Sequence, residues 1–124
     1  MTRSILLLIA LSVTLSAFAQ LTLKMGMASP AVQSALQIGY VWHGIAAIAT
    51  SGLVIGGLAL YFASAAVWLM VLAKVDVSIA YPFVAGAFVL TMLLAWVIRD
   101  EPLSLAKVGG TALIAAGVIL LSRA

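Results

Sequence analysis

The chain has 124 residues, of which 66% are hydrophobic and 7% charged, and its formal net charge is +3. Soluble domains carry roughly 25% charged residues, and so short a chain cannot bury that much apolar surface in a soluble core. The composition therefore excludes an ordinary soluble domain and predicts an integral membrane protein. The absence of cysteine excludes disulfides and thiolate chemistry. Its scattered cations form no nucleic-acid patch, so no nucleic-acid partner is expected.

Four apolar segments predict an all-α, four-transmembrane-helix bundle in a single domain, 1–124. A helix of about 20 residues covers the roughly 30 Å hydrocarbon core of a bilayer. The expected spans are 4–23, 46–73, 78–98 and 105–121. Between the first two, an interfacial helix is expected over 32–42, because Pro30 can begin a helix and because Tyr40 and Trp42 suit the head-group level.

The N-terminal segment has a second interpretation. Arg3, the apolar run 5–11 and Ala17 to Ala19 before Gln20 together imitate a secretory signal peptide. Apolar residues continue beyond the supposed cleavage site over 21–23. A retained first span is therefore the expectation.

The basic residues do not set an orientation. Four spans place Arg3, Lys74 and Arg123 on one side and Lys24, Arg99 and Lys107 on the other. The positive-inside rule has nothing to act on when both sides carry equal charge. Either a partner sets the topology, or the chain inserts both ways and pairs with itself, or the balance arose by chance.

Polar and aromatic residues share faces within the predicted spans. They are Ser12, Ser16, Gln20 and Lys24 in the first span, Tyr61, Ser64 and Trp68 in the second, and Tyr81 in the third. Polar groups are costly in lipid, so they are functional candidates. We expect a groove with a cation at its mouth. The serines are interpreted mainly as packing contacts, and for Gln20 and Lys24 both substrate binding and simple snorkelling stay open.

The fourth span predicts a dimer seam. Gly110, Ile114, Gly117 and Leu121 share one face, and its two glycines allow close helix approach. Ser104 is expected to cap this helix.

Few residues could support other chemistry. For Glu101, a cap or an ion pair with Arg99 is favoured over a substrate contact. His43 has no second histidine or carboxylate at ligand spacing, so no metal site is expected. The sequence offers no nucleophile-and-base arrangement, so neither an enzyme nor a cofactor is expected.

The second to fourth predicted spans, from about Leu58 to Leu121, resemble the four-helix, EamA-like members of the drug/metabolite transporter superfamily. The matching segments are Ser78-Ile-Ala-Tyr-Pro, Glu101-Pro-Leu-Ser and Gly110-x-x-Leu-Ile-x-x-Gly-Val. The last is similar to the dimerisation segment of small multidrug resistance proteins. The resemblance implies a four-helix transporter that works as a dimer.

Helix 1 separates the branches of that superfamily. Cation exporters carry an essential glutamate mid-helix, whereas here Ser16 aligns and no acid precedes Val75. The pattern Ala19-Gln20-x-x-x-Lys24 instead resembles the paired subunits that flip aminoarabinose-linked undecaprenyl phosphate. The connection 25–45 is longer than usual for that group.

The sequence therefore predicts a multi-pass flippase of the bacterial inner membrane. It would move a polyprenyl-phosphate-linked sugar or similar anionic amphiphile, as a homodimer or as a heterodimer with a sister subunit. The expected substrate-binding residues are Lys24, Gln20, Tyr61, Trp68 and Tyr81, with Ser16, Ser64 and Glu101 secondary. Two alternatives stay open: a proton-coupled exporter of cations or small metabolites, and a non-transporting membrane subunit of a glycosyltransferase system.

Overall fold

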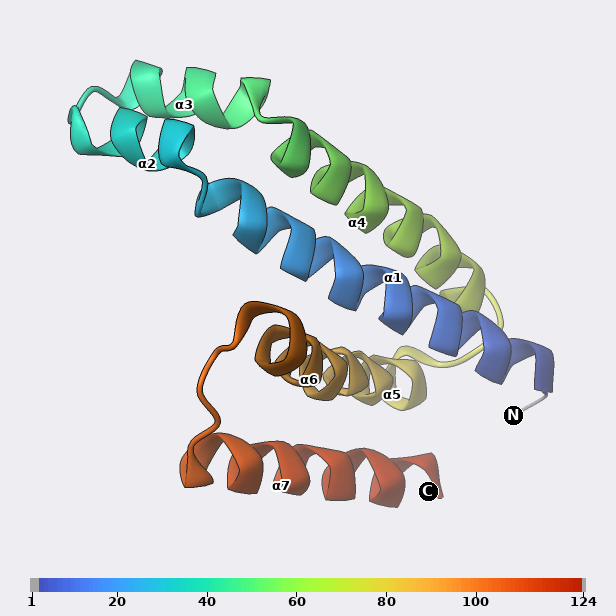
Figure 1. The fold of residues 1–124 in the computed structure, drawn as a ribbon. Helices are drawn as coiled ribbons and strands as arrows, with labels where there is room; N and C mark the ends of the chain where they lie inside the picture. Colours follow the sequence, from blue (N-terminus) through green and yellow to red (C-terminus); the bar gives the residue numbers. More distant parts are fainter. Residues whose placement is uncertain (1–2, 124) are drawn as a thin grey trace.

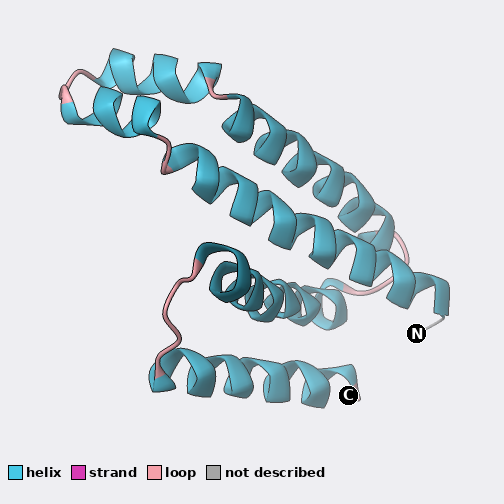
Figure 2. Ribbon diagram, in the orientation of Figure 1, coloured by secondary structure: helices cyan, strands magenta, loops and turns pink. Residues whose placement is uncertain are grey.

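The computed structural model describes residues 3–123, and these form helices joined by short turns, with no strand among them (Figure 2). In chain order they are α1 (Arg3–Met27), α2 (Pro30–Gln37), α3 (Val41–Thr50), α4 (Gly52–Leu72), α5 (Val77–Ala80), the 3₁₀ helix η1 (Tyr81–Val84), α6 (Ala85–Arg99) and α7 (Leu105–Ser122). The all-α prediction is confirmed for this part of the chain.

Helices α1 and α4 form an antiparallel pair that is continued at one end by the shorter pair α2 and α3 (Figure 1). Glycines bring the backbones of α1 and α4 together. A Cβ atom on Gly57 would lie 2.8 Å from Leu23 Cγ, and one on Gly26 would lie 2.7 Å from Val54 Cγ2. Both distances are too short for real contacts, so each glycine admits its neighbour only because it lacks a side chain.

Two buried serines join α1 and α4 at a second point, nearer the start of α1. The Ser12 hydroxyl donates to the Ser64 carbonyl over 3.0 Å, and the Ser64 hydroxyl donates to the Ser12 carbonyl over 2.8 Å. Each hydroxyl thus has a partner away from water. The pair forms a reciprocal polar link in an otherwise apolar contact.

The connection between α1 and α4 differs from the expectation. The interfacial helix expected over 32–42 is interrupted by a turn, where Gly39 has a φ of +87°. The span expected over 46–73 is also divided, because α3 ends at Thr50 and α4 begins at Gly52. Ser51 accounts for this break, since its hydroxyl accepts a hydrogen bond from Val54 N and so caps α4.

The third apolar segment is a composite of α5, η1 and α6. Pro82 lies at the start of the 3₁₀ turn, where its missing N–H leaves few hydrogen bonds unmade. Helix α6 ends at Arg99 and is followed by Asp100, whose φ of 52° turns the chain out of the helix. This left-handed residue begins the loop that leads to α7.

Helix α7 packs mainly against α6 (Figure 1). The Thr111 hydroxyl donates to Met92 Sδ over 3.2 Å. The face expected to form a dimer seam is open: Ile114 is 36% and Leu121 45% exposed. A Cβ atom on Gly110 or Gly117 would meet nothing within 4 Å.

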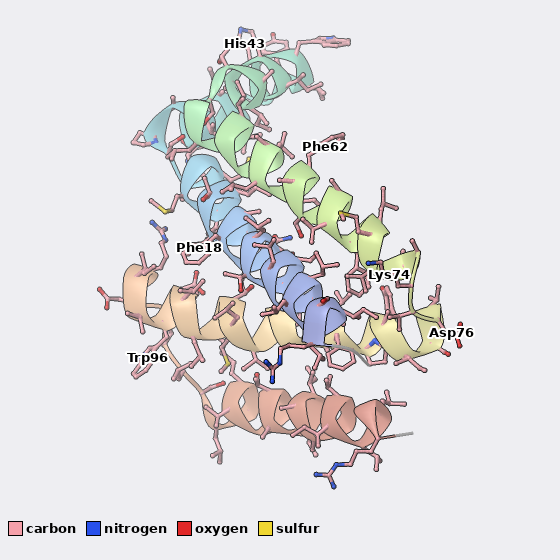
Figure 3. All side chains as sticks on the ribbon, turned by 90° about the vertical axis from the view of Figure 1, so that its right-hand side faces the viewer. Phe18, His43, Phe62, Lys74, Asp76 and Trp96 are labelled. Atoms are coloured by element: carbon pink, nitrogen blue, oxygen red, sulfur yellow. The ribbon has the colours of Figure 1, made fainter. Side chains whose placement is uncertain are left out.

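Three helical segments in the described part are long and apolar enough to cross a membrane: Arg3–Met27, Gly52–Leu72 and Val77–Arg99. Leu105–Leu121 is also apolar but shorter. Only 33%, 22% and 11% of the apolar windows of these three segments are buried within the chain. Aromatic side chains such as Phe18, Phe62 and Trp96 project outward (Figure 3). Lipid or a partner must cover these surfaces, as in a multi-pass membrane protein, while the count of four spans stays a prediction.

Candidate functional site

Two adjoining cavities lie between α1, α4, η1 and α6. The large cavity has a volume of about 520 Å³ and the small cavity about 240 Å³. Ser16, Tyr61, Val84 and Ala87 line both of them. We call the two together the groove. The large cavity alone falls within the range of about 300–1,000 Å³ that is usual for small-molecule sites.

The wall of the large cavity combines apolar side chains with polar groups from four parts of the chain. The polar groups are Ser16 and Gln20 of α1, Tyr61 of α4, Thr91 of α6, and Glu101 and Lys107 of the segment that follows. This mixture of a mostly apolar wall with a few converging hydrogen-bonding groups is typical of a ligand site.

The small cavity continues the groove toward η1. Its wall includes the aromatic side chains of Tyr61, Trp68 and Tyr81 and the paired serines Ser12 and Ser64. The serine hydroxyls already have partners in each other's helices. Among residues 3–123, the hydrogen-bonding capacity that stays free at this cavity comes from the hydroxyls of Ser16 and the two tyrosines and from the indole N–H.

The groove gathers most of the residues expected to bind substrate. Gln20, Tyr61, Ser16 and Glu101 line the large cavity, and Tyr61, Trp68, Tyr81, Ser16 and Ser64 line the small one. Faces recognised by their spacing on three separate segments therefore meet in space. Their role in binding stays a prediction.

Lys24 is the exception among the expected residues. It lies in the last turn of α1, is exposed, and lines neither cavity. Figure 1 shows that this end of α1 adjoins α2, away from α6 and α7. The polar stripe of α1 therefore leaves the groove after Gln20, because the helix continues past the elements that form the other wall.

Lys107 supplies the cation of the large cavity instead. Its Nζ donates to the Pro102 carbonyl over 2.9 Å, and its backbone N–H donates to the Ser104 hydroxyl over 3.1 Å. Ser104 thus caps α7 as expected. Sequence reasoning counted Lys107 only as a loop charge. One signal could have singled it out: a lysine in the first turn of a helix opposes the helix dipole, so its position calls for another reason.

Glu101 does not cap α7, which is one of the two roles favoured for it by the sequence. The cap of α7 comes from Ser104, and the partly buried Glu101 lines the large cavity. Its backbone N–H donates to the Ala95 carbonyl over 3.3 Å, which holds this residue against the end of α6. A contact between Glu101 and substrate stays a prediction.

His43 lies on α3, away from the groove (Figure 3). Its ring is 5.6 Å from that of Tyr40. Within residues 3–123, no three His, Cys, Asp or Glu side chains gather in a way that could hold a metal ion.

The fold and the groove define a helical, multi-pass membrane protein with a candidate ligand site between its helices. No protein-family model matches the chain, and no solved structure matches it significantly.

Several curated proteins nevertheless match the sequence of the chain. A probable 4-amino-4-deoxy-L-arabinose-phosphoundecaprenol flippase subunit ArnF from Shewanella sediminis is 37% identical over 125 residues, covering 92% of this chain and 84% of that protein. A probable subunit ArnE of the same flippase from Pseudomonas savastanoi is 37% identical over 94 residues, covering 76% of this chain and 71% of that protein. The ArnE subunit from Pseudomonas aeruginosa is 46% identical over 56 residues, covering 45% and 49%.

The chain belongs to the ArnE and ArnF family of flippase subunits. The resemblance noted in the sequence is confirmed at this level, and the relatives are named as flippase subunits rather than enzymes. The match with the Pseudomonas aeruginosa relative spans about half of its length. Placement in the wider drug/metabolite transporter superfamily stays a prediction.

Proposed function

We propose that this protein is one subunit of a flippase that moves a polyprenyl-phosphate-linked sugar between the leaflets of the bacterial inner membrane. Membership of the family supports this proposal. The observation that carries it is the groove, where Gln20, Tyr61 and Glu101 converge from three elements of an otherwise apolar molecule. The relatives are named for 4-amino-4-deoxy-L-arabinose-phosphoundecaprenol, which is therefore the substrate class that we propose.

The chemistry of the groove suits a lipid-linked sugar. A flippase must shield a polar head from the hydrocarbon while the apolar tail stays in it. The Gln20 amide and the Tyr61 hydroxyl can donate to and accept from sugar hydroxyls. Trp68 and Tyr81 offer flat apolar faces with a polar edge, which suit the ring of a sugar. The polyprenyl tail would lie outside the groove, against the apolar helix surfaces.

The transporting unit would be a dimer. The exposed face of α7 that contains Gly110 and Gly117 is its proposed seam, and a second copy or a sister subunit would cover it. The relatives carry two subunit names, ArnE and ArnF. A heterodimer is therefore our preferred assembly, and a sister subunit would also set the orientation that the balanced charges do not.

The experiment measures lipid-linked aminoarabinose that reaches the outer leaflet of membrane vesicles, with the chain expressed alone and with an ArnE or ArnF sister subunit. We expect Gln20→Ala and Tyr61→Phe to lower the rate about 2- to 10-fold, the cost of one neutral hydrogen bond. Gln37→Ala and Tyr40→Phe are the matched controls, because both lie outside the two cavities. If the wild-type chain transports none of this lipid in either setting, the proposal is wrong.

Lys24 is tested in the same assay. As the phosphate contact expected from the sequence, it would make Lys24→Gln strongly defective and leave Lys24→Arg partly active. As an exposed interface anchor outside the groove, it would make both changes nearly silent. Equal transport by wild type and Lys24→Gln would remove this residue from the substrate site.

A second candidate is the proton-coupled cation exporter, which the presence of the Glu101 carboxylate in the large cavity favours. The remaining acids, Asp76 and Asp100, flank helices outside both cavities. In such an exporter, a lipophilic cation would displace a proton from Glu101. Proton release on adding that cation to detergent-purified protein, lost in Glu101→Gln, would support the exporter, and no release is what the flippase predicts.

A further inference from the structure

The large cavity holds one positive and one negative side chain. All six basic and three acidic residues lie within the described residues 3–123, and among these only Lys107 and Glu101 line either cavity. Both come from the segment between the end of α6 and the first turn of α7. We call residues 100–107 the charged turn. The remaining charges lie outside the groove.

The conformation of the charged turn holds both groups at the cavity. Asp100 is left-handed and turns the chain, after which the Glu101 N–H bonds back to the Ala95 carbonyl. The Ser104 cap fixes the first turn of α7. The Lys107 ammonium uses one of its three protons for the Pro102 carbonyl, which leaves two for a ligand.

This pairing has an electrostatic consequence. A cavity with a single cation would favour any phosphate, whereas a cavity with one charge of each sign favours a ligand that also carries both. A phosphate-linked amino sugar has such a head group, because its phosphate is an anion and its amine is protonated near neutral pH. The corresponding sugar without a free amine would leave the partly buried Glu101 carboxylate beside the ligand without a counter-charge, which makes that ligand less complementary to the cavity.

We propose that the charged turn selects a zwitterionic head group, with Lys107 binding the phosphate and Glu101 binding the amine. This inference rests on the flippase function proposed above. It assigns the phosphate to Lys107 on α7 rather than to Lys24 on α1. It also makes amine recognition a separate step from binding of the sugar ring by Gln20 and Tyr61.

The test compares two substrates in the vesicle assay: aminoarabinose-phosphoundecaprenol and the same lipid with its amine acetylated, which removes the charge. The wild type should prefer the free amine. We expect Glu101→Gln to lower transport of the free-amine lipid about tenfold and to abolish this preference. Lys107→Gln should lower transport of both lipids about tenfold, and Lys107→Arg should restore much of it.

Controls come from the first residue of the charged turn and from the residue before it. Asp100→Asn keeps a residue type that tolerates the left-handed conformation, and Arg99→Gln removes a neighbouring cation. Neither side chain lines the cavities, so both variants should keep the wild-type rate and preference. The preference is a ratio measured within each variant, so it does not depend on how much protein accumulates.

Two failures can be told apart. If the wild type moves neither lipid, the flippase function itself is wrong. If the wild type moves the free-amine lipid while Glu101→Gln keeps its preference, or Lys107→Gln keeps its rate, the flippase stands and the assignment of the charged turn is wrong.

Discussion

Glycines occur both in the α1–α4 pair and in α7, but their surroundings in the structure differ. Gly26 and Gly57 each face a neighbouring helix so closely that a Cβ atom would meet backbone nitrogen, at 2.9 Å for Gly26 and 3.0 Å for Gly57. Gly110 and Gly117 of α7 face open space. The first two glycines are packed against a helix of the same chain, whereas Gly110 and Gly117 have no such neighbour among residues 3–123.

The comparison separates folding from assembly. Contacts that close α1 on α4 are made inside one chain, so changes there should alter its stability. The open face of α7 contributes no such contact, so changes there should alter only what the chain binds. Glycine thus has two roles in this protein, one in the stability of the chain and one in its assembly, and substitutions can distinguish them.

The largest effect is expected at Gly57. Gly57→Ala would put a methyl group against Leu23 N and Cγ and should lower the free energy of unfolding by about 1–3 kcal/mol, the usual cost of overpacking. Gly56→Ala, one residue away on the same helix, meets nothing within 4 Å and should raise the free energy of unfolding by up to about 1 kcal/mol through helix propensity alone. Unfolding in mixed detergent micelles measures both.

The Gly56 variant also corrects for helix propensity, since alanine replaces glycine within α4 in both cases. Equal stability of the two variants would show that α1 and α4 do not approach as closely as described.

A feature of the fold can be predicted from the sequence when it depends on neighbouring residues alone. Apolar runs and the cap at Ser104 are local, and three expected segments, 4–23, 78–98 and 105–121, are helical in the structure. The break at Ser51 was missed because the apolar run continues through it, so hydropathy gives no boundary there. The turn at Gly39 was missed for the same reason, although a glycine with a positive φ is a common turn device.

Helical periodicity predicted most residues of the groove, but it did not predict which lysine lines it. Gln20 and Tyr61 lie on faces that spacing identifies, and these faces meet at one cavity. Whether Lys24 or Lys107 reaches that cavity depends on where α1 extends beyond α6, which is a property of helix packing. Periodicity fixes a face of a helix but not how far along it a partner extends.

The next largest effect is expected at Gly117. Gly117→Leu should separate the helices of the proposed α7 seam and weaken dimerisation about tenfold or more, equivalent to about 1.4 kcal/mol. The stability of the separate subunit should not change, because the glycine faces open space. Crosslinking in membranes and unfolding in detergent give the two readouts.

Gly109→Leu is the matched control, because Gly109 also faces open space but lies off the seam face. We expect its dimer to be unchanged. A dimer that survives Gly117→Leu as well as it survives Gly109→Leu would refute this seam.

The smallest effect is expected at the serine pair of the α1–α4 contact. Ser12→Ala and Ser64→Ala each remove one of two reciprocal hydrogen bonds, and hydrogen bonds between membrane helices contribute about 0.6 kcal/mol on average and at most about 1.7. The double mutant should therefore show a coupling free energy of that size in a double-mutant cycle. Thr14→Ala is the control on α1, because its hydroxyl bonds only to the Ala10 carbonyl of its own helix. Coupling between Ser12 and Ser64 no larger than that between Thr14 and Ser64 would mean that these helices are held by the close approach at Gly26 and Gly57 alone.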